Sequence, residues 1–263
     1  MERFVGRRVL VTGGGSGIGQ ATVLRVLAEG GRVVAVDADE QGLAATARKA
    51  EAQRCGQLLT TRVMDISQEE SVRSGVAAAL DEMGGLDVLV NAAGILRSEH
   101  THTMSLERFN RVIGVNLTGT FLVIRECIPA LLRGEQPVIV NFSSTSATFA
   151  HPYMAAYAAS KGGIQSMTHA LAVEYSKQGL RAVAVAPGSV SSGMTDASGS
   201  SQANAGPGLP ADADMDLLAK LSPMIGDGFG GPETVAGVVA TLASSDGAFV
   251  TGTEVRIDGG THA

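Results

Sequence analysis

Short runs of apolar and β-branched residues alternate along this chain with longer segments in which apolar residues recur at helical spacing. Several runs are apolar at every position, which is typical of parallel strands covered by helices on both faces. The alternation predicts an α/β fold with a doubly wound, Rossmann-type, mostly parallel sheet of seven strands and right-handed crossovers. The expected strands span residues 8–12, 32–37, 58–63, 86–91, 138–143, 180–186 and 253–257, and the clearest helices residues 16–29, 39–54, 106–132 and 157–177.

The 263 residues contain no internal repeat and no interdomain linker, so we expect a single domain over residues 1–263. One stretch departs from the pattern, with nine glycines from Gly188 to Gly231. Long irregular loops in compact domains are usually functional, and we interpret residues 188–231 as a lid over a substrate pocket. The alternative is a disordered surface insertion. A short helix is expected inside it, because apolar residues at helical spacing follow two possible caps: Asp212, Asp214, Met215, Leu218 and Leu221.

The composition limits the partners and the location of the protein. Hydrophobic residues make up 44% and charged residues 17% of the chain, with a net charge of −6 and no stripe of Lys and Arg, which argues against nucleic acid as a partner. Apolar runs are shorter than the roughly 20 residues of a membrane-spanning helix. We expect no membrane segment and no signal peptide. Cys55 and Cys127 lack metal or redox spacing and indicate reduced thiols in a cytoplasmic protein.

A glycine-rich turn joins the first expected strand to the first expected helix. Glycine lets the backbone bend tightly and approach a pyrophosphate, and the helix N-terminus offers free N–H groups to the anion. The spacing is T-G-x(3)-G-x-G rather than G-x-G-x-x-G, and the residues expected to contact a dinucleotide are Gly13, Ser16, Gly17, Ile18 and Gly19. Alone, such a turn fits any tight strand-to-helix connection, but its position after the first strand favours dinucleotide binding.

Asp37 ends the second expected strand, where a carboxylate accepts hydrogen bonds from the adenosine ribose and repels a 2′-phosphate. Ala38 and Asp39 follow it and supply no cation for such a phosphate. We therefore predict NAD (NAD⁺/NADH) as the cofactor. The alternative is that Asp37 is the N-cap of the next helix.

Tyr157 and Lys161 are four residues apart in the helix expected over residues 157–177 and therefore share one helical face. Free tyrosine has a pKa of about 10, too high for a base at neutral pH. A nearby ammonium and a positive nicotinamide would both lower the pKa of Tyr157. Ser144 follows the strand over residues 138–143, at the carboxyl edge of the sheet where ligands bind in such folds.

These motifs resemble the short-chain dehydrogenase/reductase family, and the resemblance extends from Arg7 to Gly260. It implies a hydride transfer between NAD and a secondary alcohol or ketone, with oxidation favoured. It also implies a catalytic tetrad. Tyr157 would be the general base and acid, Ser144 would hold the substrate oxygen, and Lys161 would steady the phenolate and grip the nicotinamide ribose. Asn116 would hold a water that links the lysine to solvent.

The same resemblance assigns further contacts to the adenine half of the cofactor. Asp65 and Ile66 would contact the adenine ring. Asn91, Ala92 and Gly94 correspond to the family's N-N-A-G element, in which Ala92 replaces the second asparagine. These residues would pack against the cofactor and support the sheet.

For the nicotinamide half, the resemblance points to the segment after the sixth strand. Pro187 and Gly188 begin this element, and the Val190 backbone with a following hydroxyl would hold the carboxamide. Ser192 stands where the family has threonine, and Thr195 is a second candidate for this hydroxyl. The substrate pocket would lie between Ser144 and Tyr157 and under the lid, with His151, Met154 and Met194 in its wall.

Two alternative functions remain open. A carbonyl reductase resembling the NADP(H)-dependent 3-oxoacyl-carrier-protein reductases would have basic residues near the glycine turn, which are missing here. A non-catalytic NAD-binding sensor would be expected to lack part of the tetrad. Glu99, His100 and His102 could indicate a metal site, but histidines two apart in a polar loop are more often solvated, and we predict no metal. The family also implies a homotetramer.

Overall fold

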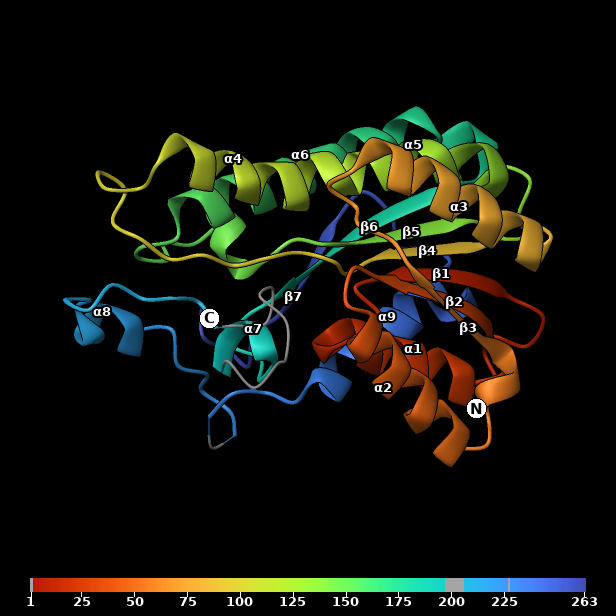
Figure 1. The fold of residues 1–263 in the computed structure, drawn as a ribbon, viewed down its shortest axis with the longest axis horizontal. Coiled ribbons are helices and arrows are strands. Elements are labelled where there is room, and N and C mark those ends of the chain that lie inside the picture. Colours follow the sequence, from red (N-terminus) through yellow and green to blue (C-terminus); the bar gives the residue numbers. More distant parts are fainter. Residues whose placement is uncertain (1, 197–205, 227) are drawn as a thin grey trace.

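The computed structural model describes residues 2–196, 206–226 and 228–263. Within these residues the chain forms one domain, a seven-stranded parallel sheet between two layers of helices (Figure 1). The strand order is β3-β2-β1-β4-β5-β6-β7, which confirms the expected doubly wound fold. The strands are β1 (Arg8–Thr12), β2 (Arg32–Asp37), β3 (Leu59–Val63), β4 (Val88–Asn91), β5 (Val138–Phe142), β6 (Arg181–Pro187) and β7 (Glu254–Ile257).

The helices cover both faces of the sheet. One layer consists of α1 (Gly17–Ala28), α2 (Glu40–Ala52) and α9 (Pro232–Ala243), and the other of α3 (Glu69–Met83), α4 (Leu106–Ile113), α5 (Thr120–Leu131) and α6 (Ala155–Glu174) (Figure 1). The segment after β6 contains the short helices α7 (Gly193–Asp196) and α8 (Met215–Ala219). Single 3₁₀ turns span Gly56–Leu58, Thr145–Ala147, Ser176–Gln178 and Ser245–Gly247.

The central strands are buried on both faces, because successive side chains of each strand pack alternately against one helix layer and the other. Val9 and Val11 of β1 face the core shared with α1 and α9, whereas Leu10 faces the core shared with α3 and α5. All three side chains are fully buried. This explains why the sequence of β1 is apolar without a polar alternate.

The strand order reverses at β1, which pairs with β2 on one side and with β4 on the other. Thr12 is in register with Asn91, so the two strands end at the same level of the sheet. In doubly wound sheets, ligands bind in the crevice that opens at this reversal, outside the carboxyl ends of the strands. The glycine turn and the residues after β4 are therefore brought side by side.

The helix expected over residues 106–132 is not regular. α4 and α5 are joined by a π-helical segment, Gly114–Gly119, and π-helical turns are frequently found at functional sites. Among the described helices, Leu106–Leu131 is the one long and apolar enough to cross a membrane by length and composition, with 44% of its most apolar window buried. It packs against α3 and β4, as core helices of globular proteins do.

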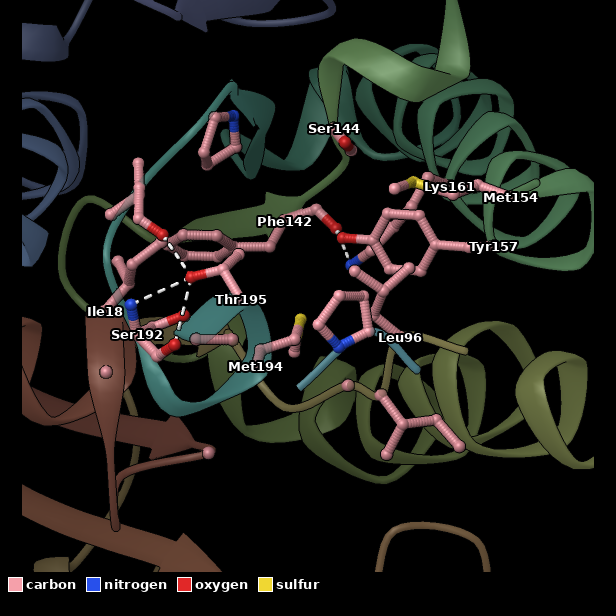
Figure 2. Close-up of a pocket in the computed structure, with 18 of the residues that line it drawn as sticks. Ile18, Leu96, Phe142, Ser144, Met154, Tyr157, Lys161, Ser192, Met194 and Thr195 are labelled. Carbon is pink, nitrogen blue, oxygen red and sulfur yellow. Dashed lines mark hydrogen bonds between the residues drawn. The ribbon is translucent and has the colours of Figure 1, made fainter. Parts of the chain in front are cut away.

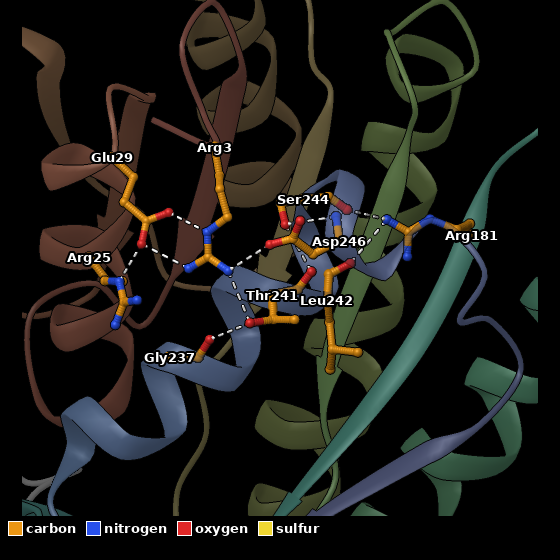
Figure 3. A network of polar contacts seen from close by, with 9 residues as sticks. All are labelled: Arg3, Arg25, Glu29, Arg181, Gly237, Thr241, Leu242, Ser244 and Asp246. Carbon is orange, nitrogen blue, oxygen red and sulfur yellow. Dashed lines mark hydrogen bonds and ion pairs between the residues drawn. The ribbon is translucent and has the colours of Figure 1, made fainter. Parts of the chain in front are cut away.

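A network of polar contacts ties the N-terminal segment to two helices of one layer (Figure 3). Arg3 donates from Nε and Nη2 to the two carboxylate oxygens of Glu29, at 2.6 and 2.8 Å, and Arg25 also bonds to Glu29. Arg3 Nη1 reaches Thr241 at the end of α9 at 3.0 Å and Asp246 at 3.2 Å. The hydrogen bond from Arg3 is the main reason that the pKa of Glu29 falls to about 2.

Candidate active site

A cavity of about 830 Å³ opens at the carboxyl ends of the strands and brings together most of the residues selected from the sequence. Its wall contains Gly13, Ser16, Gly17, Ile18, Gly19, Asp37, Asp65, Ile66, Ala92, Gly94, Ser144, His151, Met154, Tyr157, Lys161, Pro187, Gly188, Val190, Ser192 and Met194. Asn91 and Asn116 lie behind this wall. The cavity has two ends, one formed by the glycine turn and the other by Tyr157 and Lys161.

The glycine turn forms one end of the cavity and has the shape of a cradle. Gly13 has a φ of +70°, and a Cβ there would lie 2.7 Å from the backbone N of Ala93. A Cβ at Gly19 would lie 2.0 Å from the carbonyl oxygen of Gly13. Only glycine fits these positions, because the turn packs directly on the segment after β4 and on the start of α1. The N-terminus of α1 thus faces the cavity, as a pyrophosphate site requires.

Asp37 lies beside this turn at the end of β2. Its Oδ2 accepts a hydrogen bond from the Gly15 backbone at 3.0 Å, and its Oδ1 accepts one from the Asp39 backbone, also at 3.0 Å. Burial raises the pKa of Asp37. The N-cap of α2 is Asp39, whose Oδ1 accepts from Gln41 and Gly42 at 3.1 and 3.2 Å. The alternative role of Asp37 as the helix cap is therefore wrong.

The residues at the ends of β3 and β4 differ in whether they line the cavity. Asp65 and Ile66 lie in its wall, with Asp65 Oδ1 accepting from the Ser67 backbone at 2.9 Å. Asn91 does not reach the cavity, because its side chain donates to Asn141 of the neighbouring strand at 2.9 Å. Asn91 thus links two neighbouring strands inside the sheet, and the residues that follow it, including Ala92 and Gly94, line the cavity.

At the other end of the cavity, Lys161 projects from α6 toward the end of β5 (Figure 2). Its Nζ donates to the Phe142 carbonyl at 2.7 Å and lies 5.6 Å from the centre of the Tyr157 ring. Lys161 is only 4% exposed, and this burial lowers its pKa to about 8. The lysine is held where its charge faces the phenol of Tyr157, one helical turn earlier.

The surroundings of Tyr157 in the protein alone act on its pKa in two directions. Burial raises it to about 12, and a hydrogen bond with Ser144 acts in the opposite direction without offsetting the burial. The physical reason for the rise is that the strand end and α6 enclose the phenol, and desolvation disfavours its charged form. The expected lowering by the ammonium and the positive nicotinamide together concerns the complex with the cofactor and stays a prediction.

Asn116 occupies the π-helical segment and is fully buried. Its Oδ1 accepts from the Ile95 backbone at 2.8 Å, and its Nδ2 donates to the Ile95 carbonyl at 2.9 Å and to Ser160 Oγ at 3.0 Å. A Cβ at Gly94 would lie 3.2 Å from Asn116 Oδ1 and 3.7 Å from Lys161 Nζ. Asn116 therefore fixes the backbone beside the lysine and links three parts of the wall.

The segment after β6 covers the remaining side of the cavity (Figure 2). Thr195 Oγ1 accepts from the Ser192 backbone at 3.0 Å and donates to the Val190 carbonyl at 2.8 Å, and Ser192 and Thr195 both line the cavity. The predicted short helix is present as α8, with Asp214 as its cap at 2.9 Å from the Asp216 backbone. Residues 197–205 and 227 of the expected lid lie outside the described residues.

His151 and Met154 lie in the wall between Ser144 and Tyr157, as expected for a substrate pocket. His151 Nε2 is 3.2 Å from Thr145 Oγ1, and burial lowers the pKa of His151 to about 4. Several wall residues were not selected from the sequence, because they meet only in the fold: Leu96, Arg111, Leu209, Phe229 and Leu221. Of these, Leu221 had a signal, namely its helical spacing after Met215.

The histidines considered for a metal site have other neighbours. His100 Nε2 lies 2.9 Å from Asp212 Oδ1, and the His100 ring meets Tyr153 edge-on with centroids 5.1 Å apart. Across residues 2–196, 206–226 and 228–263, no three His, Cys, Asp or Glu side chains are grouped so as to hold a metal ion.

Comparison with known proteins identifies the family. The short chain dehydrogenase family model matches residues 7–203. A 3beta-hydroxysteroid dehydrogenase of Eggerthella lenta is 38% identical over 258 residues, covering 97% of this chain and 93% of that protein. The chain belongs to the short chain dehydrogenase family. This short chain dehydrogenase is therefore an oxidoreductase of alcohol and ketone groups that uses a nicotinamide cofactor.

Solved structures of the family do not decide between the two nicotinamide cofactors. A short chain dehydrogenase from Mycobacterium paratuberculosis bound to NAD superposes with a TM-score of 0.88 at 28% identity, covering 98% of both chains. One from Burkholderia cenocepacia in complex with NADP superposes with a TM-score of 0.85 at 29% identity, covering 99% of this chain and 100% of the other. The cradle of Gly13 and Gly19 fits the dinucleotide that both of these structures contain.

Proposed function

We propose that this short chain dehydrogenase is an NAD-dependent enzyme that oxidises a secondary alcohol to a ketone, with Tyr157 as the general base. The main support is the arrangement of Tyr157 and Lys161. The buried Lys161 ammonium is held by the Phe142 carbonyl at 2.7 Å and faces the Tyr157 ring at 5.6 Å. In a non-catalytic sensor this cation would only bind the cofactor, whereas beside Tyr157 it can also stabilise the phenolate that a general base requires.

The chain's own residues divide the chemistry between them. Ser144 and Tyr157 hydrogen-bond the carbinol oxygen and fix its orientation. The bound nicotinamide supplies the two-electron acceptor, so that the carbinol carbon loses a hydride and the hydroxyl loses a proton to Tyr157 Oη as the ketone forms. Lys161 favours the phenolate electrostatically and binds the ribose. Asn116 keeps the Ile95 backbone and the π-helical segment in place beside Lys161.

NAD, rather than NADP, is proposed from the surroundings of Asp37. Its carboxylate already accepts backbone hydrogen bonds from Gly15 and Asp39, and the neighbouring Ala38 carries no charge. A 2′-phosphate at this place would meet the Asp37 carboxylate and the Asp39 side chain. Ribose hydroxyls, which donate hydrogen bonds, are the better match.

Three further properties belong to this proposal. Residues 188–231 act as a lid, supported by α8 and by Met194 in the cavity wall. The enzyme is a homotetramer with D₂ symmetry, supported by exposed apolar side chains of Phe121, Val173 and Phe249 on α5, α6 and before β7. Its location is cytoplasmic, supported by two free, buried cysteines, Cys55 and Cys127.

The experiment is a screen of secondary alcohols with NAD⁺ and with NADP⁺, read by the absorbance of the reduced cofactor. We expect turnover of at least one alcohol with NAD⁺ and a lower kcat/KM with NADP⁺. Turnover only in the reductive direction with NADPH would replace the proposal by the carbonyl reductase alternative. Binding of NADH with no turnover of any alcohol or ketone would support the sensor.

A further inference from the structure

One charged residue in the cavity wall has no role in the chemistry described above. Arg111 lines the cavity, whose wall also contains the apolar side chains of Leu96, Val115 and Leu209. It is exposed, and among the described residues it makes neither an ion pair nor a side-chain hydrogen bond. The Arg111 guanidinium is therefore able to bind an anionic group of a ligand in the cavity.

Arg111 lies at the substrate end of the cavity, not at the cofactor end. It is on α4, one helical turn before Val115, and both residues line the cavity. Val112, the next residue, is fully buried in a small cluster with Ile95 and Ala156, against which Tyr157 packs. The guanidinium of Arg111 therefore projects from the helix that flanks the proposed base.

Two further arginines lie near Arg111. Arg97 and Arg108 are close enough that their charges interact, and burial together with repulsion from Arg108 and Arg111 lowers the pKa of Arg97. Arg108 has an acidic partner, Glu99, at 3.1 Å. Asp216 of α8 also lines the cavity, so its wall carries charges of both signs.

Residues 206–209, part of the segment that covers the pocket, lie against Ser98 and Arg108. The Ser98 backbone donates to the Pro207 carbonyl at 2.7 Å, and Arg108 Nη2 lies 4.0 Å from the position of a Cβ at Gly208. Leu209 follows in the cavity wall. A ligand group that reaches Arg111 would therefore be enclosed between α4 and residues 206–209, where solvent screens a charge less than on an open surface.

We propose that Arg111 is an anion subsite and that the substrate is a hydroxy acid, with its carboxylate on Arg111 and an apolar spacer between the carboxylate and the carbinol held at Tyr157. The planar guanidinium matches a carboxylate bidentately. Leu96, Val115 and Leu209 would contact the spacer. This inference rests on the proposed alcohol oxidation, whose product would be the corresponding oxo acid.

The test uses the series of hydroxy acids from 3-hydroxybutanoate to 6-hydroxyheptanoate, each compared with its methyl ester. The ester keeps the carbinol and the spacer but removes the charge. With NAD⁺, we expect kcat/KM of the acid to exceed that of the ester by roughly tenfold to a hundredfold at one spacer length, as is typical of a charge-assisted hydrogen bond. Arg111→Gln should abolish this preference by lowering kcat/KM of the acid toward that of the ester, and Arg111→Lys should restore part of it.

Arg133→Gln is the matched control, because it removes the same charge at the amino edge of the sheet, where Glu135 N–H donates to Asp87. It should retain the full preference for the acid. Equal kcat/KM for acid and ester at every spacer length, or a preference that survives in Arg111→Gln, would overturn the anion subsite.

A binding measurement separates the two proposals. The oxo acid of each hydroxy acid is titrated calorimetrically into the NADH complex of the wild type and of Arg111→Gln. Arg111-dependent binding without turnover of any alcohol would retain the subsite and reject the alcohol oxidation. Turnover of neutral alcohols, with each oxo acid bound equally by the wild type and by Arg111→Gln, would retain the oxidation and reject the subsite. Neither turnover nor Arg111-dependent binding would reject both.

Discussion

The imidazole of His262 stacks on the ring of Phe149, with ring centroids 4.2 Å apart and an angle of 18° between the planes. Asp258 fixes the imidazole at 3.1 Å from Nδ1, and the Arg256 guanidinium covers Phe149 at 5.1 Å. Phe149 belongs to the loop that carries His151 in the cavity wall. The last strand of the sheet is thus followed by residues that hold the substrate loop in position.

Replacing His262 tests this support. We expect His262→Ala to raise KM for the alcohol roughly two- to tenfold, because an aromatic pair contributes about 0.5–1.5 kcal/mol. The Kd for NADH should not change, since the glycine turn and Asp37 are untouched. His262→Phe keeps the stack and should restore KM, whereas His169→Ala, at an exposed histidine of α6, is the control. An unchanged KM in His262→Ala would show that the stack does not position the loop.

The contact between His262 and Phe149 also marks the limit of sequence reasoning. The strands and the spacing of Ser144, Tyr157 and Lys161 were predictable, because strand patterns and i, i+4 pairs are local properties of the chain. Phe149 and His262 meet only through the tertiary fold. Arg111 is a further example, since an exposed helical arginine has no local signal until the fold places it in a cavity.

Two further features depend on the tertiary fold. The π-helical segment was not expected inside the helix over residues 106–132, because it depends on the bonds between Asn116 and the distant Ile95 backbone. In the protein alone, burial raises the pKa of Tyr157 to about 12, and no local pattern of the sequence indicates this burial. Helices α3 and α9 were not singled out from the sequence, although Val72, Val76 and Ala79 of α3 have regular helical spacing.

The Arg3–Glu29 pair should stabilise the fold at neutral pH. Glu29 is 5% exposed at its side chain, and its pKa falls from 4.5 to about 2, so its stabilisation is present above 4.5 and is lost as the pH falls through 2. Arg3→Ala leaves the carboxylate without its main partner and should lower the free energy of unfolding at neutral pH by about 2 kcal/mol.

Thermal unfolding of wild type and Arg3→Ala at several pH values measures this effect. The difference in Tm between them should shrink as the pH falls below 4.5, because protonated Glu29 no longer needs the arginine. Arg73→Ala removes an exposed pair with Glu70 and should change stability by less than about 1 kcal/mol at any pH. A Tm difference that is independent of pH would indicate that Arg3 acts through packing alone.

Cofactor preference should depend on Asp37. Replacing Asp37 with Ser and Ala38 with Arg removes the carboxylate that faces the ribose and supplies a cation for a 2′-phosphate. We expect NADH to bind more tightly than NADPH to the wild type, and the double variant to narrow or reverse this difference. Tighter binding of NADPH to the unmodified protein would contradict the proposed role of Asp37. Fluorescence titration with both reduced cofactors measures it.

The assignment of the base to Tyr157 can be tested by substitution and by pH. Tyr157→Phe should keep the fold and the affinity for NADH, while activity falls by about 10²–10⁴-fold or more, the range for general acid–base catalysis. Lys161→Ala should lower both the rate and the affinity for the cofactor, because Lys161 is proposed to bind the ribose as well. If Tyr157→Phe kept most of the activity, Tyr157 would not be the base.

The pH dependence of oxidation tests how Tyr157 becomes a base at all. In the protein alone, burial holds the pKa of Tyr157 at about 12, so the phenol stays protonated over the whole neutral range. The positive charge of the oxidised nicotinamide would favour the phenolate, as would the Lys161 ammonium, whose own pKa is about 8. Since the phenolate is the active form, kcat/KM should rise with pH, with an apparent pKa below the value of about 10 for free tyrosine. Lys161→Ala should shift the rise of kcat/KM to higher pH. The same apparent pKa in both proteins would show that Lys161 does not lower the pKa of Tyr157.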